Sequence, residues 1–140
     1  MKSLIRIFVL FLMFIVIVAA IIWVVDIYNR PNMIAKILKI EKPPKSMKVH
    51  GCSYPFTSDI LTTCAISIDS KEFEMLIAGY EYKKIKVNGS SFKFVGPKVG
   101  QEFEADVMYS VEPKEYAHGG FVRVIVNRER NYALIDDYIE

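Results

Sequence analysis

An uninterrupted apolar run near the N-terminus constrains this chain more than any other feature. Residues 4–25 read LIRIFVLFLMFIVIVAAIIWVV, and the 19 residues from Ile7 to Val25 contain no charged side chain, proline or glycine. A helix of that length is about 28 Å long, which matches the hydrocarbon thickness of a bilayer. The run is apolar on every helical face, unlike a surface helix of a soluble domain. We therefore expect one transmembrane helix, with the lipid bilayer as partner of residues 4–25.

The apolar run is predicted to be retained as a signal anchor. A cleaved secretory signal has a shorter apolar region, followed by a small-residue cleavage site. Here Ala19 and Ala20 are followed by five further apolar residues, IIWVV. Trp23 and Tyr28 are aromatic residues of the kind that is enriched at membrane interfaces.

Prolines and lysines mark the region between the apolar run and the rest of the chain. Pro31 is expected to kink or end the helix, and residues 33–40 fit a helix or a strand equally well. Pro43-Pro44 enforces an extended boundary. Three parts are therefore predicted: a cytoplasmic head and anchor (1–28), a basic, proline-containing stalk (29–45) and a small extracytoplasmic domain (46–140).

The flanking charges give two opposed signals about which side of the membrane the domain faces. Lys2 and Arg6 precede the apolar run, whereas one arginine and four lysines follow it within residues 30–45. Those later charges favour a cytoplasmic domain. However, charges far from the helix count for less, and the first charge after the helix is the acidic Asp26. We expect a single-pass protein of the inner (plasma) membrane with its domain exported. The alternative is a cytoplasm-facing scaffold whose lysines hold anionic lipid.

The charge of the distal residues argues against one class of partner. Residues 49–140 contain 10 basic and 14 acidic side chains. Nucleic-acid-binding domains present a basic surface instead. No nucleic acid is therefore expected among the partners.

Alternating apolar and polar residues predict an antiparallel sheet in the domain. Strands are expected over residues 47–50, 60–68, 83–94, 103–111, 121–126 and 132–139, with Asn88-Gly89 as a hairpin turn inside 83–94. Asp69 with Glu72 three residues later is typical of a capping box, and Gly79 is placed to end the short helix. The predicted fold class is α+β: an N-terminal transmembrane helix, then a small antiparallel sheet with one packed helix.

Two cysteines, Cys52 and Cys64, lie on the predicted strands that flank the 53–63 turn. In an exported domain such a pair is expected to form a disulfide. Two buried free thiols are the first alternative. The second is a zinc site that adds His50 and His118, but their spacing matches none of the usual zinc patterns. No metal and no cofactor is therefore expected.

His118 is the one residue that suggests an enzyme. It lies beside Glu112, Glu115 and Tyr116, and a histidine near carboxylates can act as a general base. The chain contains no G-x-S-x-G, no H-E-x-x-H and no glycine-rich phosphate loop. A small enzyme that uses His118 is therefore the less favoured interpretation, and no catalytic residue is assigned.

Aromatic residues outside the apolar run favour a binding function. Tyrosine is common at protein interfaces, and loops on a rigid sheet usually carry binding residues. Two predicted loops, 52–59 and 112–120, contain such residues. The predicted partner-binding residues are Tyr54, Phe56, Tyr116 and His118. We expect a membrane-anchored binding or accessory protein of the cell envelope that acts through protein–protein contact. A narrower alternative is an inhibitor or immunity-type protein against a toxin or hydrolase.

Overall fold

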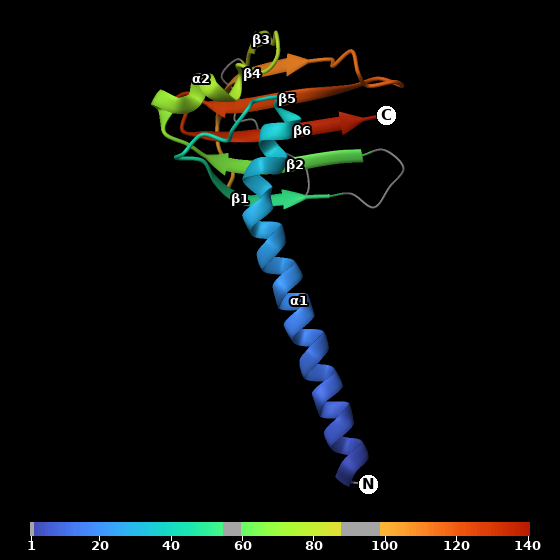
Figure 1. The fold of residues 1–140 in the computed structure, drawn as a ribbon. Coiled ribbons are helices and arrows are strands. Elements are labelled where there is room, and N and C mark those ends of the chain that lie inside the picture. Colours follow the sequence, from blue (N-terminus) through green and yellow to red (C-terminus); the bar gives the residue numbers. More distant parts are fainter. Residues whose placement is uncertain (1, 55–59, 88–98) are drawn as a thin grey trace. The chain divides into compact units, whose positions relative to one another are not determined.

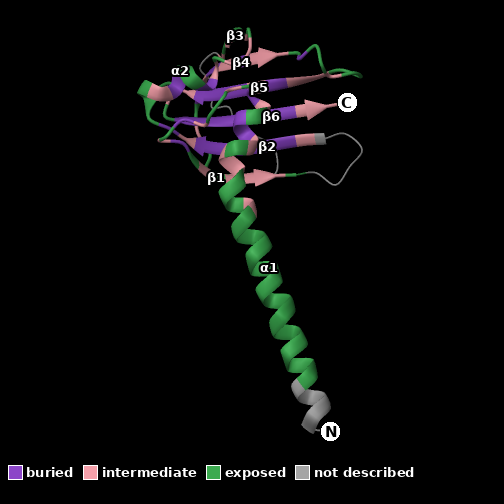
Figure 2. Ribbon diagram, in the orientation of Figure 1, coloured by how far each residue is buried: buried purple, intermediate pink, exposed green. Residues whose placement is uncertain are grey.

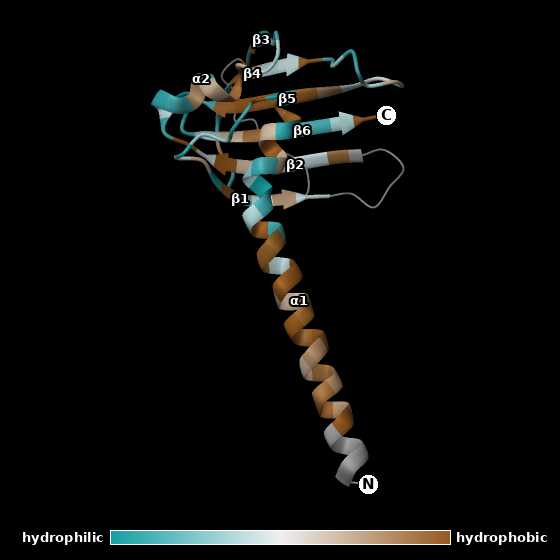
Figure 3. Ribbon diagram, viewed as in Figure 1, coloured by the Kyte–Doolittle hydropathy of each residue, from teal (hydrophilic) through white to brown (hydrophobic). Residues whose placement is uncertain are grey.

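Helix α1 (Lys2–Ile37) contains the whole apolar run. The computed structural model of the chain describes residues 2–54, 60–87 and 99–140. From Ile7 to Val25 the helix side chains are exposed and apolar (Figures 2 and 3). By length and composition this helix can cross a membrane, and none of its most apolar stretch is buried within the protein. An exposed apolar surface of this extent is suited to lipid rather than to water.

The residues divide into two compact units, 1–30 and 31–140. In the first unit, Arg30 Nε and Nη2 both donate to Asp26 Oδ2, at 3.0 and 2.7 Å. These residues are four apart on one helix face, where opposite charges meet. Asp26 is therefore neutralised locally by the first basic residue that follows the apolar run.

In the described part of the chain, the second unit is built on one six-stranded sheet in which all neighbouring strands are antiparallel (Figure 1). The strand order is β1-β2-β6-β5-β4-β3. The strands are β1 (Lys48–Ser53), β2 (Ile60–Ser67), β3 (Lys83–Lys86), β4 (Ala105–Val111), β5 (Gly120–Asn127) and β6 (Tyr132–Ile139). Together with a short helix, this sheet confirms the predicted α+β class.

Each face of the sheet carries its own apolar cluster. On the first face, strand residues such as Ile66, Val124 and Ile135 pack with helical residues, including Phe73 and Leu76. The second face holds a smaller cluster. Its buried members are Ala65, Ala105, Ile125, Tyr132 and Leu134. The central strands β2, β5 and β6 contribute to both clusters, so each carries apolar residues on both faces instead of a strict alternation with polar ones.

The predicted stalk belongs in part to the domain. Ile34 and Leu38 are fully buried in the first-face cluster, and Pro44 is buried as well. The helix continues past Pro31 to Ile37 instead of ending there. Burial of the apolar side chains that follow the proline stabilises these last turns, which offsets the hydrogen bond that proline cannot donate. The compact unit therefore begins at residue 31, whereas the composition suggested residue 46.

A β-bulge changes the predicted alternation of the fourth strand. Phe103, Ala105, Val107, Tyr109 and Val111 alternate in sequence, which predicts one common face. In the structure Val107 and Tyr109 lie in the first-face cluster, but Phe103 and Ala105 lie with the second. The register of β4 against β5 shifts between Ala105 and Val107. The extra residue of such a bulge reverses the face on which the preceding side chains point.

The short helix forms where it was predicted, but only the Asp69 half of the predicted capping box is present. Residues Ser70–Glu72 form a 3₁₀ turn that continues into α2 (Phe73–Leu76), and Asp69 Oδ1 accepts from Lys71 N at 3.0 Å. Glu72 does not return to Asp69. Its Oε2 accepts from Ser46 N and Ser46 Oγ, at 3.0 and 2.8 Å, and these bonds lower the Glu72 pKa. The carboxylate thus connects the helix to the preceding segment.

Gly79 is required by close packing. A Cβ there would overlap the backbone carbonyl of Leu38 and the backbone of Lys39. The residue after α2 therefore approaches the end of α1 more closely than any side chain allows. The predicted turn at Asn88-Gly89 lies outside the described residues, although β3 is present and Ile85 pairs with Met108 of β4.

Candidate functional site

A disulfide joins Cys52 and Cys64, which are directly paired residues of the adjacent strands β1 and β2. It therefore links an edge strand to the interior of the sheet. Cys64 is fully buried and belongs to the first-face cluster. Both sulfurs are used in this bond, so the alternatives of two free thiols and of a zinc site with thiolate ligands do not apply.

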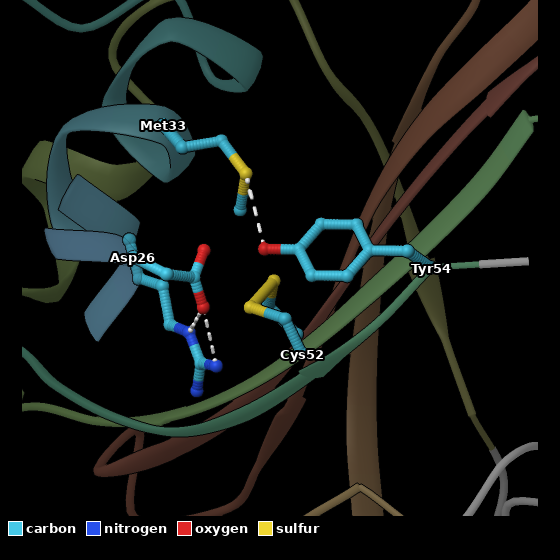
Figure 4. Close-up of polar contacts among 6 residues, drawn as sticks. Asp26, Met33, Cys52 and Tyr54 are labelled. Carbon is cyan, nitrogen blue, oxygen red and sulfur yellow. Dashed lines mark hydrogen bonds and ion pairs between the residues drawn. A yellow bond between two sulfur atoms is a disulfide. The ribbon is translucent and has the colours of Figure 1, made fainter. Parts of the chain in front are cut away.

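Tyr54 follows directly after the disulfide-bonded strand. Its ring is 43% exposed, and its hydroxyl points to Met33 Sδ at 3.5 Å, beside the disulfide (Figure 4). A thioether is a weak acceptor. Tyr54 therefore presents part of an amphipathic aromatic surface to solvent next to a covalently fixed strand. Phe56, the second residue predicted in this loop, lies outside the described residues.

Tyr116 lies in the 112–119 loop between β4 and β5, and its hydroxyl is committed to the sheet. It donates to Asp137 Oδ1 at 2.6 Å, and the Asp137 side chain is buried. Burial and the neighbouring Asp137 raise the pKa of Tyr116, so this hydroxyl remains a donor at neutral pH. A Cβ at Gly120, where φ is +141°, would overlap Tyr138 O and crowd the Tyr116 ring. The loop is therefore held in one place by a buried bond and a required glycine.

A second contact ties the same loop to the segment that follows α1. Glu115 Oε1 lies 2.6 Å from Lys39 Nζ, and Tyr80 Oη donates to the same oxygen at 3.4 Å. The Lys39 ammonium also lies 5.1 Å from the centre of the Tyr80 ring. The lysine lowers the pKa of Glu115, whereas burial and Glu115 raise the pKa of Tyr80 to about 12. This network orders the loop rather than forming a catalytic pair.

His118 is exposed at the tip of the same loop. Two of its three predicted neighbours are bonded elsewhere, because Glu115 contacts Lys39 and Tyr116 contacts Asp137. Within residues 2–54, 60–87 and 99–140, no carboxylate is within hydrogen-bonding distance of the His118 ring. A general base needs an orienting partner, so the described structure offers no support for the enzymatic alternative.

Tyr54 and the 112–119 loop lie at the same end of the sheet, which we call the loop end. Strands β1, β4 and β6 finish there, and β2 and β5 begin there (Figure 1). Tyr54 follows β1, while Tyr116 and His118 precede β5. Two strands separate β1 from β5, so these positions are about 14 Å apart across the sheet. One protein partner can contact a surface of that width.

Most of the other tyrosines are structural. Tyr109 and Tyr132 are buried, and Tyr80, Tyr82, Tyr116 and Tyr138 are half-buried. Edge-to-face contacts join Tyr80 to Tyr82 and Tyr82 to Tyr109, with ring centres 5.6 and 6.5 Å apart. These tyrosines therefore belong to the packed domain rather than to an exposed binding surface. Among the described tyrosines of the domain, Tyr54 alone is exposed.

A polar row on the second face was missed in the sequence. Thr63, Asp136 and Arg123 are directly paired across β2, β6 and β5. Thr63 is fully buried, and its hydroxyl donates to the buried Asp136 at 2.8 Å. Burial raises the pKa of Asp136, an effect that Thr63 and Arg123 oppose. The signal in the sequence was Asp136-Asp137 inside an otherwise apolar strand.

Comparison of the chain with protein-family models, with curated proteins and with solved structures finds no match. The function is therefore argued from the residues of the chain itself.

Tyr116→Phe should lower the free energy of unfolding by about 1–3 kcal/mol, because it leaves the buried Asp137 carboxylate without its hydroxyl donor. Urea unfolding of the full chain in detergent, followed by circular dichroism of the sheet, measures this. The control is the same substitution in an Asp137→Asn background, where no buried charge is orphaned and the cost should be smaller. An equal loss of stability in both backgrounds would show that the Tyr116 hydroxyl does not stabilise the Asp137 carboxylate.

Asp136→Asn should gain stability relative to the wild type as pH rises. The folded pKa of Asp136 is raised above its ordinary value of 3.8, so the folded state binds the proton more tightly. That contribution is complete below the unfolded pKa and is lost as pH rises through the folded pKa. The asparagine cannot titrate and still accepts from Thr63. Urea unfolding of both proteins at several pH values, from about 4 to 7, tests this; a constant difference would contradict it.

Proposed function

We propose that this protein is a single-pass, membrane-anchored accessory protein that presents a small disulfide-bonded domain on the extracytoplasmic side and acts by protein–protein contact. The contact surface is the loop end of the sheet, with Tyr54 and His118 at its exposed positions. Tyr116 fixes the loop that carries His118 through its hydrogen bond to Asp137.

The observation that carries this proposal is that Tyr54 and the 112–119 loop, which come from separate parts of the chain, lie at one end of the sheet. The Cys52–Cys64 bond secures the strand before Tyr54, and the Tyr116–Asp137 bond secures the loop that carries His118. Preorganised loops lose less entropy on binding, which favours affinity. The disulfide also supports the exported side, because such bonds persist in oxidising compartments. The exposed apolar helix supports the membrane anchor.

Position-specific photocrosslinking in cells tests the contact surface. A photoreactive amino acid is placed at Tyr54 or His118, and the matched control is the exposed Glu129 in the β5–β6 turn at the opposite end. Covalent adducts of one defined mass are expected from the first two positions and not from the control. Adducts of equal yield from all three positions, or from none, would contradict the proposed surface.

Topology is tested separately with reporters fused after Glu140. An export-dependent phosphatase should be active there, and a cytoplasm-dependent fluorescent reporter should be dark. The opposite pattern would reject the extracytoplasmic domain and favour the cytoplasm-facing scaffold.

A further inference from the structure

A cation and two aromatic rings form a stack near the loop end, on the second face of the sheet. The Arg123 guanidinium carbon lies 3.6 Å from the centre of the Phe121 ring. Phe121 stacks in turn on Tyr138 of the neighbouring strand, with ring centres 5.2 Å apart and planes inclined by 28°. All three side chains are half-buried. The stack holds the guanidinium flat, which reduces the entropy that a further hydrogen bond would cost.

The donors of Arg123 are unused in the described part of the chain. Its Nε is buried and has no acceptor, and no ion pair involves its guanidinium there. Asp136 is directly opposite on β6, but its carboxylate accepts a hydrogen bond from Thr63 instead. A guanidinium donor without an acceptor is unfavourable in a partly buried position, so an acceptor that reaches the Arg123 guanidinium from solvent would be favoured.

A surface depression of about 510 Å³ adjoins this stack. Phe121 and Tyr138 line it together with Tyr116 and Lys114 of the 112–119 loop. Glu112 is the remaining charged residue of its lining. The depression therefore combines three aromatic residues with one acidic and one basic residue. Arg123 lies two positions beyond Phe121 along β5.

We propose that Arg123, held on Phe121, binds the carboxylate of an acidic side chain in a polypeptide partner, while an adjacent apolar side chain of that partner enters the depression. This inference rests on the proposed function and names the chemistry of the partner. A guanidinium matches a carboxylate with two parallel hydrogen bonds. Arginine and aromatic residues also dominate the energetics of protein interfaces. A phosphate-bearing partner is disfavoured, because one guanidinium would face a dianion, whereas it matches the single charge of a carboxylate.

The test uses the full chain in nanodiscs of neutral lipid and two blocked peptides, acetyl-Leu-Glu-Phe-amide and its Gln counterpart. The Nε–Hε resonances of the chain's five arginines report binding directly. The Glu peptide should shift the Arg123 resonance saturably and bind at least tenfold tighter than the Gln peptide. Arg123→Gln should lose this preference, whereas Arg128→Gln, at an exposed arginine in the β5–β6 turn, should keep it.

Equal binding of the two peptides, no shift of the Arg123 resonance, or tighter binding of inorganic phosphate would overturn the inference. The peptide comparison is made on the wild-type chain, so it does not depend on the folding of a variant. Crosslinking from Tyr54 and His118 separates this inference from the proposed function. Adducts that persist undiminished in Arg123→Gln overturn the carboxylate site alone. Glu-dependent peptide binding without adducts supports the carboxylate site and overturns the proposed contact surface.

Discussion

Replacing Leu38 by alanine should lower the free energy of unfolding of the domain by about 2–5 kcal/mol, the range for truncating a fully buried leucine. Leu38 has no exposed surface and packs in the first-face cluster, although it lies only seven residues after Pro31. A loss of this size is a large fraction of the stability of a typical small domain. Urea unfolding of the full chain in detergent, followed by circular dichroism, measures it.

The matched control is Lys36→Ala, two residues earlier on the same segment. Lys36 is exposed, so its substitution should change the free energy of unfolding by less than about 0.5 kcal/mol. If the segment were a solvated stalk, both substitutions would have the same small effect. Equal changes in the free energy of unfolding would therefore show that the domain starts at residue 46.

The double substitution Cys52→Ala and Cys64→Ala should cost about 3 kcal/mol. The disulfide closes a loop with a sequence separation of 12, and its removal restores the chain entropy of the unfolded state. Cys64 is fully buried, so alanine is chosen to avoid burying a serine hydroxyl. The expected result is a lower urea midpoint without loss of the sheet's circular dichroism signal.

A reducing agent provides the control for this prediction. It should lower the midpoint of the wild-type chain and leave that of the double variant unchanged. Mass measurement under the same conditions should show a gain of two hydrogens in the wild type only. A wild-type chain from cells that gains no hydrogens would show that the bond does not form there.

Local patterns predicted the elements of the domain well because each depends on neighbouring residues. The strand predicted over residues 132–139 is β6, and Asp69 capped the short helix as predicted. The bulge at Ala105/Val107 was not predictable, because it depends on the register against β5. For the same reason the second half of the capping box failed: Glu72 found better donors in Ser46, 26 residues away in sequence.

The candidate site was predictable only in part. The loops that carry Tyr54 and His118 were identified from turn residues and aromatics, and the cysteine pair from its spacing. Tyr116 was assigned to the exposed surface, yet its hydroxyl is bonded to the buried Asp137. Arg123 was not singled out, because an arginine in an alternating strand resembles an ordinary solvated residue. Its importance comes from the stack on Phe121 and from its unpaired donors.

The sequence alone determined that this chain has a long apolar helix and a small α+β domain. These features follow from hydrophobicity and periodicity, which act over a few residues. The tertiary structure decided where the domain begins, because burial of Ile34 and Leu38 depends on strands far along the chain. The tertiary structure also decided which side-chain polar groups have a hydrogen-bond partner and which do not. A hydroxyl or guanidinium has the same local sequence in both cases, and only its packed surroundings determine whether it has a partner.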